Sequence, residues 1–264
     1  MMNSRFFDIA YQGHVQQKDA YTCISPSGVI ADWVNTYWQL DVLPGRFVYR
    51  SVPDNCIDWI INRHDPLDSF IVAPFSQAIE FPIEGPASFF GIRFKLTAYQ
   101  NIVAAPVGEW QGEETNLASS QLISSLLMEQ ISQAITDHPS LQACADKVSA
   151  ILLNALRPAK LDKRLENLAY AAASSNHLDI NSFGVSARHL RRLSQLYFGL
   201  SIKEFLNVMR FQKTLHLMHT TNNASVWLTH YYDQSHFIRE FKSMSGTSPK
   251  KFFTMSVLYN QPSH

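Results

Sequence analysis

Two short segments of this chain carry cationic and hydrogen-bonding side chains at helical spacing. In the first segment, Arg188 and Arg192 are one helical turn apart, and Arg191 and Gln195 fall on the same side. In the second segment, the side chains expected to point outward are Ser235, His236, Arg239 and Lys242. Arginine offers a planar fork of donors that matches phosphate oxygens and the acceptor edge of guanine. These residues therefore suit the recognition of DNA better than they suit catalysis.

The first cationic segment is predicted to be a helix that begins at Ala187. Ser186 can cap it by accepting a hydrogen bond from an unpaired backbone N–H group. Three apolar residues recur at helical spacing and should face a core: Leu190, Leu193 and Tyr197. Gly184 precedes the cap and accepts a positive φ without strain, as the turn of a helix-turn-helix requires.

The second segment repeats this arrangement. Asp233 can cap a helix whose inward-facing residues are Phe237, Phe241 and Met244. Gly246 is placed to end that helix. Ser248 and Pro249 then provide the N-cap and the first position of a last helix.

Between the two segments, residues 201–220 contain neither glycine nor proline and are rich in apolar residues. As a single helix this stretch is about 30 Å long, at about 1.5 Å per residue. One turn of B-DNA is about 34 Å, the distance between successive major grooves on one face of the duplex. The sequence therefore predicts a rigid spacer that holds two cationic helices about one duplex turn apart.

Residues from about 162 to 254 resemble the tandem helix-turn-helix domain of the AraC/XylS regulators. The matching segments are SARHLRR, FGLSIKEFLNVMRFQKTLHLM, YDQSHFIREFK and SGTSPKKF, in the order and spacing of the family. The resemblance implies seven helices, of which the third and the sixth read the major groove. The resemblance implies that these helices contact DNA through Arg188, Arg191 and Arg192 of the third helix and through Ser235, His236 and Arg239 of the sixth. The chain departs from the family pattern at Ser194, where a phenylalanine is usual, and at His230, where a glycine is usual.

The formal net charge of zero hides a division along the chain. Residues 160–264 contain 13 Lys and Arg against 6 Asp and Glu, a net charge of +7, whereas residues 1–159 contain 9 against 16, a net charge of −7. This asymmetry is typical of a chain in which only one domain meets phosphate. We place the domain boundary at the Arg157-Pro158 break, with domains at 1–157 and 158–264.

The N-terminal half is predicted to be β-rich, so that the whole chain is of the α+β class. From about residue 31 to 95, short strands follow one another at 8–12-residue spacing, which favours a small β-sandwich or barrel. From residue 97 the period becomes helical, with helices expected over 97–106, 117–137 and 140–156. Residues 1–25 show no period and are read as an irregular arm.

This half also resembles the β-rich domain of one branch of the same regulators. The segments that carry the resemblance are RSVPDNCIDWII and FFGIRFKLTAYQNIVAAPVGEW, with Asn55 where glycine is usual. It implies a cupin-like module that senses a ligand or dimerises.

No motif in the chain predicts an enzyme, a metal site or a cofactor. His14, His64 and His138 are far apart and share no ligand spacing, and no nucleophile elbow, P-loop or dinucleotide fingerprint is present. His216 and His219 form an i,i+3 pair that is more often packing than metal ligation. The cysteines, Cys23, Cys56 and Cys144, are isolated and suit a reducing cytosol, with Cys56 the one candidate for redox chemistry.

A ligand pocket in the N-terminal half has four candidate lining residues: Trp38, Arg50, Trp59 and Arg93. The two tryptophans provide large apolar faces. The two arginines flank strands that should be half-buried, and a buried arginine needs an anionic partner. A ligand is one such partner; Asp54, Asp58 or Glu84 of the chain itself is the other.

Together these features lead to the hypothesis of a cytoplasmic transcription regulator, most simply an activator, that binds double-stranded promoter DNA. RNA polymerase, a small-molecule effector and a second copy of the chain are its expected partners. No apolar run is long enough to span a membrane. The apolar face of residues 117–137 suits either a homodimer interface or packing on its own sheet. The alternatives are a degenerate regulator that acts mainly through protein contacts and, more remotely, a β-domain enzyme with a DNA-binding tail.

Overall fold

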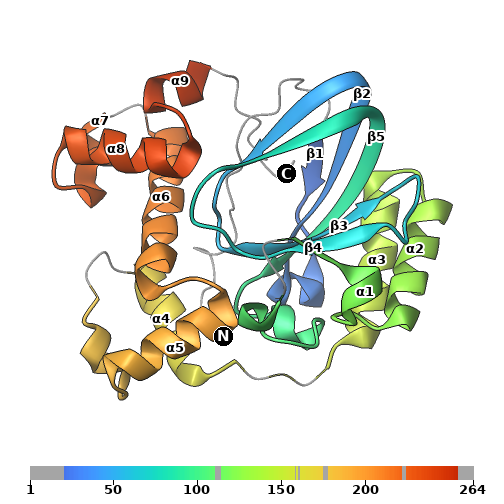
Figure 1. Ribbon diagram of the computed structural model, residues 1–264, viewed down its shortest axis with the longest axis horizontal. Helices are drawn as coiled ribbons and strands as arrows, with labels where there is room; N and C mark the ends of the chain where they lie inside the picture. The colour runs from blue at the N-terminus through green and yellow to red at the C-terminus, as the bar shows by residue number, and fades with distance from the viewer. Residues whose placement is uncertain are drawn as a thin grey trace.

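A computed structural model of the chain describes residues 21–110, 114–157, 159, 161–174, 178–221 and 224–254. An N-terminal part built on an antiparallel sheet is followed by a C-terminal part built of helices (Figure 1). The predicted α+β class is confirmed. Most of the expected N-terminal arm, His14, and Pro158 beside the expected domain boundary lie outside the described residues.

Six strands form one antiparallel sheet in the described residues, in the order β1-β2-β5-β3-β4-β6. The strands are β1 (Tyr21–Ile24), β2 (Val34–Ser51), β3 (Cys56–Asn62), β4 (Ser69–Val72), β5 (Ile79–Lys95) and β6 (Glu114–Asn116). The long strands β2 and β5 pair from Val34↔Phe94 to Ser51↔Ile79, with a bulge between Val42 and Gly45. Such a bulge bends the ribbon, so the strands expected to form a sandwich or barrel form one sheet that curls along β2 and β5 (Figure 1).

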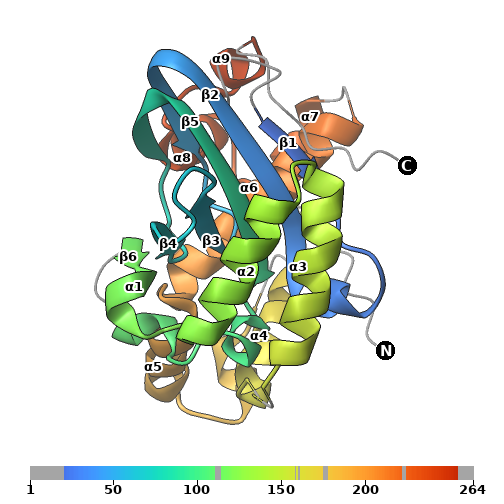
Figure 2. The ribbon, with the colours of Figure 1, turned by 90° about the vertical axis from the view of Figure 1, so that its right-hand side faces the viewer.

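The two faces of the sheet have different neighbours because side chains alternate along each strand. One face, with Tyr37, Trp59 and Ile92, is buried in the same core as α2 (Ser125–Asp137) and α3 (Leu141–Ala155), which lie against it (Figure 2). The other face forms a smaller cluster that includes Trp38. Gly91 is required beside that tryptophan, because a Cβ atom there would overlap the indole ring.

The helices of the N-terminal part match the prediction at 140–156 and differ from it at 117–137. The stretch expected at 117–137 is divided into α1 (Leu117–Ser120) and α2, because Gln121 adopts a left-handed conformation and Ser124 caps a new helix. Ile131 and Ile135 of α2 are fully buried in the chain's own core, while Leu126 is exposed. The apolar face of α2 therefore packs on its own domain. That face is not available for the homodimer interface hypothesised there. At 97–106 the expected helix is reduced to the 3₁₀ turn η2 (Tyr99–Asn101).

The C-terminal part consists, in the described residues, of α-helices and 3₁₀ turns. They are α4 (Lys163–Ser174), η4 (Ile180–Phe183), α5 (Ala187–Phe198), α6 (Ile202–Thr220), α7 (Ala224–Trp227), η5 (Leu228–His230), α8 (Gln234–Ser245) and α9 (Pro249–Thr254). The predicted spacer is α6, which is continuous over 19 residues, or about 28 Å. Ser201 and Glu204 form a capping box at its start. No helix in the described residues is long and apolar enough to cross a membrane.

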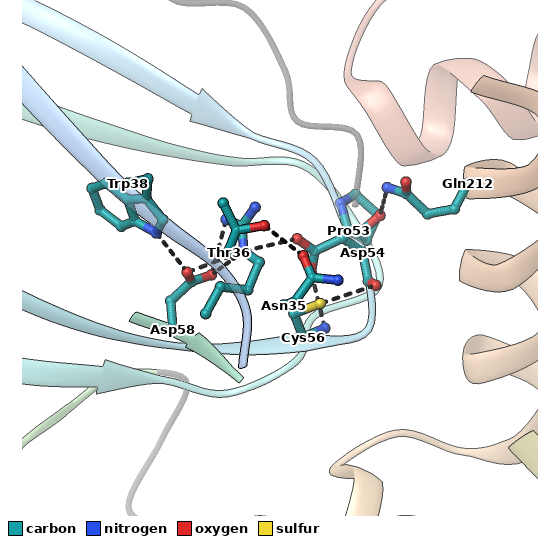
Figure 3. Close-up of polar contacts among 9 residues, drawn as sticks. Asn35, Thr36, Trp38, Pro53, Asp54, Cys56, Asp58 and Gln212 are labelled. Carbon is teal, nitrogen blue, oxygen red and sulfur yellow. Dashed lines mark hydrogen bonds and ion pairs between the residues drawn. The ribbon is translucent and has the colours of Figure 1, made fainter. Parts of the chain in front are cut away.

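A turn between β2 and β3 joins the sheet to α6. Val52 is fully buried in one cluster with Val208 and Phe211 of α6. Gln212 of α6 donates a hydrogen bond from Nε2 to the carbonyl oxygen of Pro53 at 2.7 Å (Figure 3). Asn55, with φ of 57°, donates from Nδ2 to the carbonyl oxygen of Phe205 at 3.2 Å. Asparagine tolerates this conformation better than most residues, so it can replace the usual glycine and add a bond to the spacer helix.

A second contact joins the N-terminal part to α5. The Tyr99 hydroxyl donates to the carbonyl oxygen of Tyr197 at 3.0 Å and accepts from the backbone N–H of Val107 at 2.9 Å. Gly108 fits against the end of α5, where a Cβ atom would lie 2.7 Å from the carbonyl oxygen of Gln195. One buried apolar cluster runs from the sheet through these contacts into α5 and α6. The two parts of the chain thus share a core and meet at both α5 and α6.

Substitutions at Asn55 test the left-handed turn. Asn55→Gly removes the bond to Phe205 but keeps a residue that accepts a positive φ, whereas Asn55→Ala loses both. We expect the free energy of unfolding of Asn55→Ala to be lower than that of Asn55→Gly by about 1–2 kcal/mol. Urea denaturation of the two variants measures the difference, and equal stabilities would show that the turn does not require this conformation.

Substitution of Ser201 tests the capping box of α6. We expect Ser201→Ala to lower the free energy of unfolding by about 1 kcal/mol at neutral pH, with exposed Ser243→Ala on α8 as the control. The side-chain and backbone hydrogen bonds of Ser201 hold the pKa of Glu204 below its ordinary value. A pKa that is lower in the folded state gives a contribution that is present at neutral pH and is lost as the pH falls through the folded pKa. Urea denaturation in acid should therefore show a smaller difference between Ser201→Ala and the parent; a constant difference would contradict the capping box.

Candidate nucleic-acid interface

Helix α5 presents a row of cations to solvent. Ser186 caps it, accepting a hydrogen bond at 3.3 Å from the backbone N–H of His189, and Gly184 precedes the cap with φ of 70°. Leu190, Leu193 and Phe198 are buried beneath it. The side chains on the outer side are exposed: Arg188, Arg191, Arg192 and Gln195. None of the three arginines forms an ion pair or side-chain hydrogen bond with a residue that the structure describes, so the guanidinium groups remain available to a ligand.

The end of α5 contains two polar side chains that bond to the chain itself. Ser194, at the position where the family pattern has phenylalanine, is fully buried and donates to the carbonyl oxygen of Leu200 at 2.8 Å. Its hydroxyl is therefore satisfied, and the helix keeps its packing without the larger side chain. Gln195 donates to the carbonyl oxygen of Gly199 at 3.1 Å, across the C-cap of the helix. In this conformation the amide of Gln195 is used within the helix end, whereas the guanidinium groups of the three arginines point to solvent.

Helix α8 presents a second, weaker row. Asp233 caps it, accepting from the backbone N–H of His236 at 2.7 Å, and Gly246 ends it with φ of 71°. Its inward-facing residues are Phe237, Phe241 and Met244, as predicted. Of the residues predicted to point outward, Ser235, Arg239 and Lys242 are exposed.

His236 is only half-exposed, because a polar network holds it at the start of α8. Its Nε2 lies 3.1 Å from a carboxylate oxygen of Glu240, and its Nδ1 accepts from the backbone N–H of Tyr232. Glu240 also accepts from Arg210 of α6 at 2.9 Å, and that guanidinium lies 5.9 Å from the ring centre of Tyr231. The network fixes α8 on α6, so His236 is committed to structure more than the arginines of α5 are.

The segment before α8, which contains the departure from the family pattern at His230, is short. It consists of the four residues of α7 and the turn η5, which ends at His230. Burial, with Lys213 and Arg210 nearby, lowers the pKa of His230 and favours the neutral imidazole there. Even so, α5 lies at the N-terminal end of α6, and α8 crosses α6 further along, where Arg210 contacts Glu240 (Figure 1).

The four candidate pocket residues of the N-terminal part are divided by the structure. Trp38 and Arg93 lie together, because both bond to Asp58. Trp38 Nε1 donates at 2.8 Å (Figure 3), and Arg93 Nε donates at 3.1 Å. Both also line a cavity of about 870 Å³ beside the sheet. Trp59 is buried on the opposite face of the sheet, and Arg50 pairs with Glu80; neither lines this cavity.

Arg93 is paired within the chain, as the alternative interpretation of the sequence expected. It is buried and contacts two carboxylates, Asp58 and, at 3.4 Å, Asp54. Burial opposes its charge, but Asp58 and Asp54 raise its pKa well above the ordinary value, so it stays protonated. Asp54 belongs to the turn that contacts α6, so this ion pair connects the cavity to the spacer helix.

The described residues include neither a reactive thiol nor a grouped metal-ligand set. Burial is the main reason that the pKa of all three cysteine thiols is raised. The pKa of Cys56 lies well above its ordinary value, that of Cys23 is raised to about 12 and that of Cys144 to about 11. All three therefore stay as weakly reactive thiols. The redox role considered for Cys56 is thus not supported. No group of three or more His, Cys, Asp or Glu in the described part of the chain could hold a metal ion.

Sequence reasoning missed the residues that join the two parts, above all Asn55, Gln212 and Tyr99. Their hydrogen bonds are to backbone carbonyls far away in the chain. Asn55 alone left a signal, because it stands where glycine is usual.

Two family models match the chain. One, described as a domain of unknown function (DUF6597), matches residues 22–116; the other, described as a helix-turn-helix domain, matches residues 181–255. No curated protein matches. Among solved structures, a crystal form of ToxT from Vibrio cholerae is 11% identical with a TM-score of 0.42, covering 89% of this chain and 97% of that chain. ToxT from the same organism with bound unsaturated fatty acid is 10% identical with a TM-score of 0.41, covering 94% of this chain and 96% of that chain.

The helix-turn-helix match spans η4 to α9 and so includes both cationic helices and the spacer between them. The chain therefore joins an N-terminal β-sheet domain to a C-terminal DNA-binding helix-turn-helix domain of the AraC type.

Proposed function

We propose that this protein is a transcription regulator that reads promoter DNA mainly with α5. The observation that carries the proposal is the set of exposed guanidinium groups of Arg188, Arg191 and Arg192 on a capped helix, which pair with no residue that the structure describes. Arginine bonded to the N7 and O6 atoms of guanine is the commonest specific contact in the major groove. The three side chains project from one rigid helix, as base reading requires.

The remaining cations of the domain support binding to the phosphate backbone. Contacts of this kind supply salt-dependent affinity and fix the orientation of the protein, without carrying sequence information. From α8 we assign Ser235, Arg239 and Lys242 to the duplex one turn away, with Arg239 best placed to reach a base. In this proposal His236 faces the phosphate backbone of the DNA and does not read a base, because its ring already contacts Glu240 and accepts a hydrogen bond from Tyr232.

The N-terminal domain is the regulatory part of the proposal. It contacts α5 through Tyr99 and α6 through the turn at residues 52–55, so a change in the sheet can alter the presentation of both helices. We infer that a small molecule bound in this domain controls DNA binding in the cytoplasm, and that the DNA-bound protein activates transcription by contacting RNA polymerase. A homodimer, if formed, uses a surface other than the buried face of α2.

Substitution of one arginine of α5 tests base reading. We expect Arg192→Ala to weaken binding to a selected cognate site by about 1–3 kcal/mol and to relax the preference at one base pair. Arg46→Ala, which removes an exposed arginine from the β-domain, is the matched control and should leave affinity unchanged. Site selection from a random library followed by gel-shift titration at two salt concentrations measures both effects. An equal loss on random and cognate DNA would remove the base-reading role and favour a regulator that works through protein contacts.

A further inference from the structure

The cavity beside Trp38 has the size and walls of a small-molecule site. Its volume of about 870 Å³ lies within the ~300–1,000 Å³ usual for ligand pockets. It lies on the face of the sheet opposite α2 and α3, among residues of β2, β3, β4 and β5. Six aromatic side chains line it: Trp38, Tyr49, Phe70, Phe75, Phe81 and Phe89. So many rings provide apolar area and also the negative π faces that attract cations.

The ionisable lining residues give this cavity an excess of negative charge. Three carboxylates contribute to the lining: Asp58 at the buried end, and Asp68 and Glu84, which are exposed. Arg93 is the one lysine or arginine in the lining that the structure describes. A ligand that enters therefore meets aromatic rings and carboxylates rather than a cationic anchor.

Arg93 offers little to an anionic ligand, because its own carboxylates already surround it. Asp58 accepts from Nε at 3.1 and 3.2 Å and from the terminal nitrogen at 3.1 Å, and Asp54 lies 3.4 Å from Nε. The side chain of Arg93 is 3% exposed, whereas that of Asp58 is 14% exposed. Two carboxylates and one guanidinium group together have a net negative charge. Asp58 is the more accessible of the two carboxylates. A ligand carboxylate would have to displace Asp58, while a ligand cation would be attracted to it.

We propose that this cavity binds a hydrophobic organic cation. The rings of the walls surround its apolar groups, and Asp58, Asp68 and Glu84 balance its charge. The inference rests on the proposed function in one respect, that the bound cation would be the effector. Asp58 and Asp54 share Arg93, and Asp54 lies in the turn that contacts α6, so a charge placed beside Asp58 weakens an ion pair of the joint between domains.

The experiment compares two ions of nearly the same shape and opposite charge, tetraphenylphosphonium and tetraphenylborate. Each is titrated into the full-length protein by isothermal calorimetry, in the absence of DNA. We expect the phosphonium ion to bind at least about tenfold more tightly, because the same apolar contacts are joined by favourable cation–π and carboxylate attraction. Equal affinities, tighter binding of the borate or no binding of the phosphonium ion would overturn the proposal.

Variants locate the binding site and separate its two components. Glu84→Gln combined with Asp68→Asn changes only exposed side chains and should weaken phosphonium binding several-fold while leaving borate binding no weaker. Phe89→Leu keeps apolar volume but removes a ring, and should also weaken phosphonium binding. Tyr170→Leu, an exposed aromatic residue of α4 outside the cavity, is the control and should have no effect. Phosphonium binding that is insensitive to all the cavity variants would place the ligand elsewhere and refute the site.

A separate titration with DNA keeps this inference distinct from the proposed function. Phosphonium binding with no change in DNA affinity would retain the cation site and remove its role as an effector site. DNA binding by a protein that does not take the phosphonium ion would retain the regulator and reject the cation site.

Discussion

The packing of α6 between the sheet and the two cationic helices is the constraint on which the rest of the structure depends. Phe205 near its start accepts a hydrogen bond from Asn55, and its middle contacts the turn at Val52 and Pro53 and is joined to α8 through Arg210 and Glu240. Leu215 and Met218, further along α6, are buried in one cluster with apolar residues of α8. A helix of 19 residues held along its length cannot change the separation of its ends without breaking these contacts. The spacing of α5 and α8 is therefore set by packing as well as by helix geometry, and the β-domain takes part in setting it.

Much of the helical domain could be predicted because its signals are local. Ser186, Ser201 and Asp233 each accept a hydrogen bond from a backbone N–H three residues later, so the residue type and the position are enough to mark a helix start. Gly246 at the end of α8 is equally local, since a left-handed C-cap concerns one residue. The exposed arginines follow from the same periodicity, because Leu190 and Leu193 define the buried side of α5.

The β-domain was predicted less fully because its geometry depends on register between distant strands. Trp38 pairs with Gly91 and Trp59 pairs with Ile92, and neighbouring residues of β5 face opposite sides of the sheet. One tryptophan therefore lines the cavity and the other lies in the core, although both looked alike in the sequence. The docking of Asn55 and Gln212 also depends on distant parts of the chain. The partner of Arg93 was foreseen only as one of several alternatives, since Asp54 and Asp58 are both within reach.

The central proposal is that α5 and α8, spaced by α6, enter successive major grooves on one face of the DNA. Hydroxyl-radical footprinting of the full-length protein on a selected binding site tests it most directly. The structure predicts two protected regions about 10 base pairs apart on the same face, and loss of one region when about 5 base pairs are inserted between them. A single protected region, or two regions that tolerate the insertion, would contradict the rigid spacing imposed by α6.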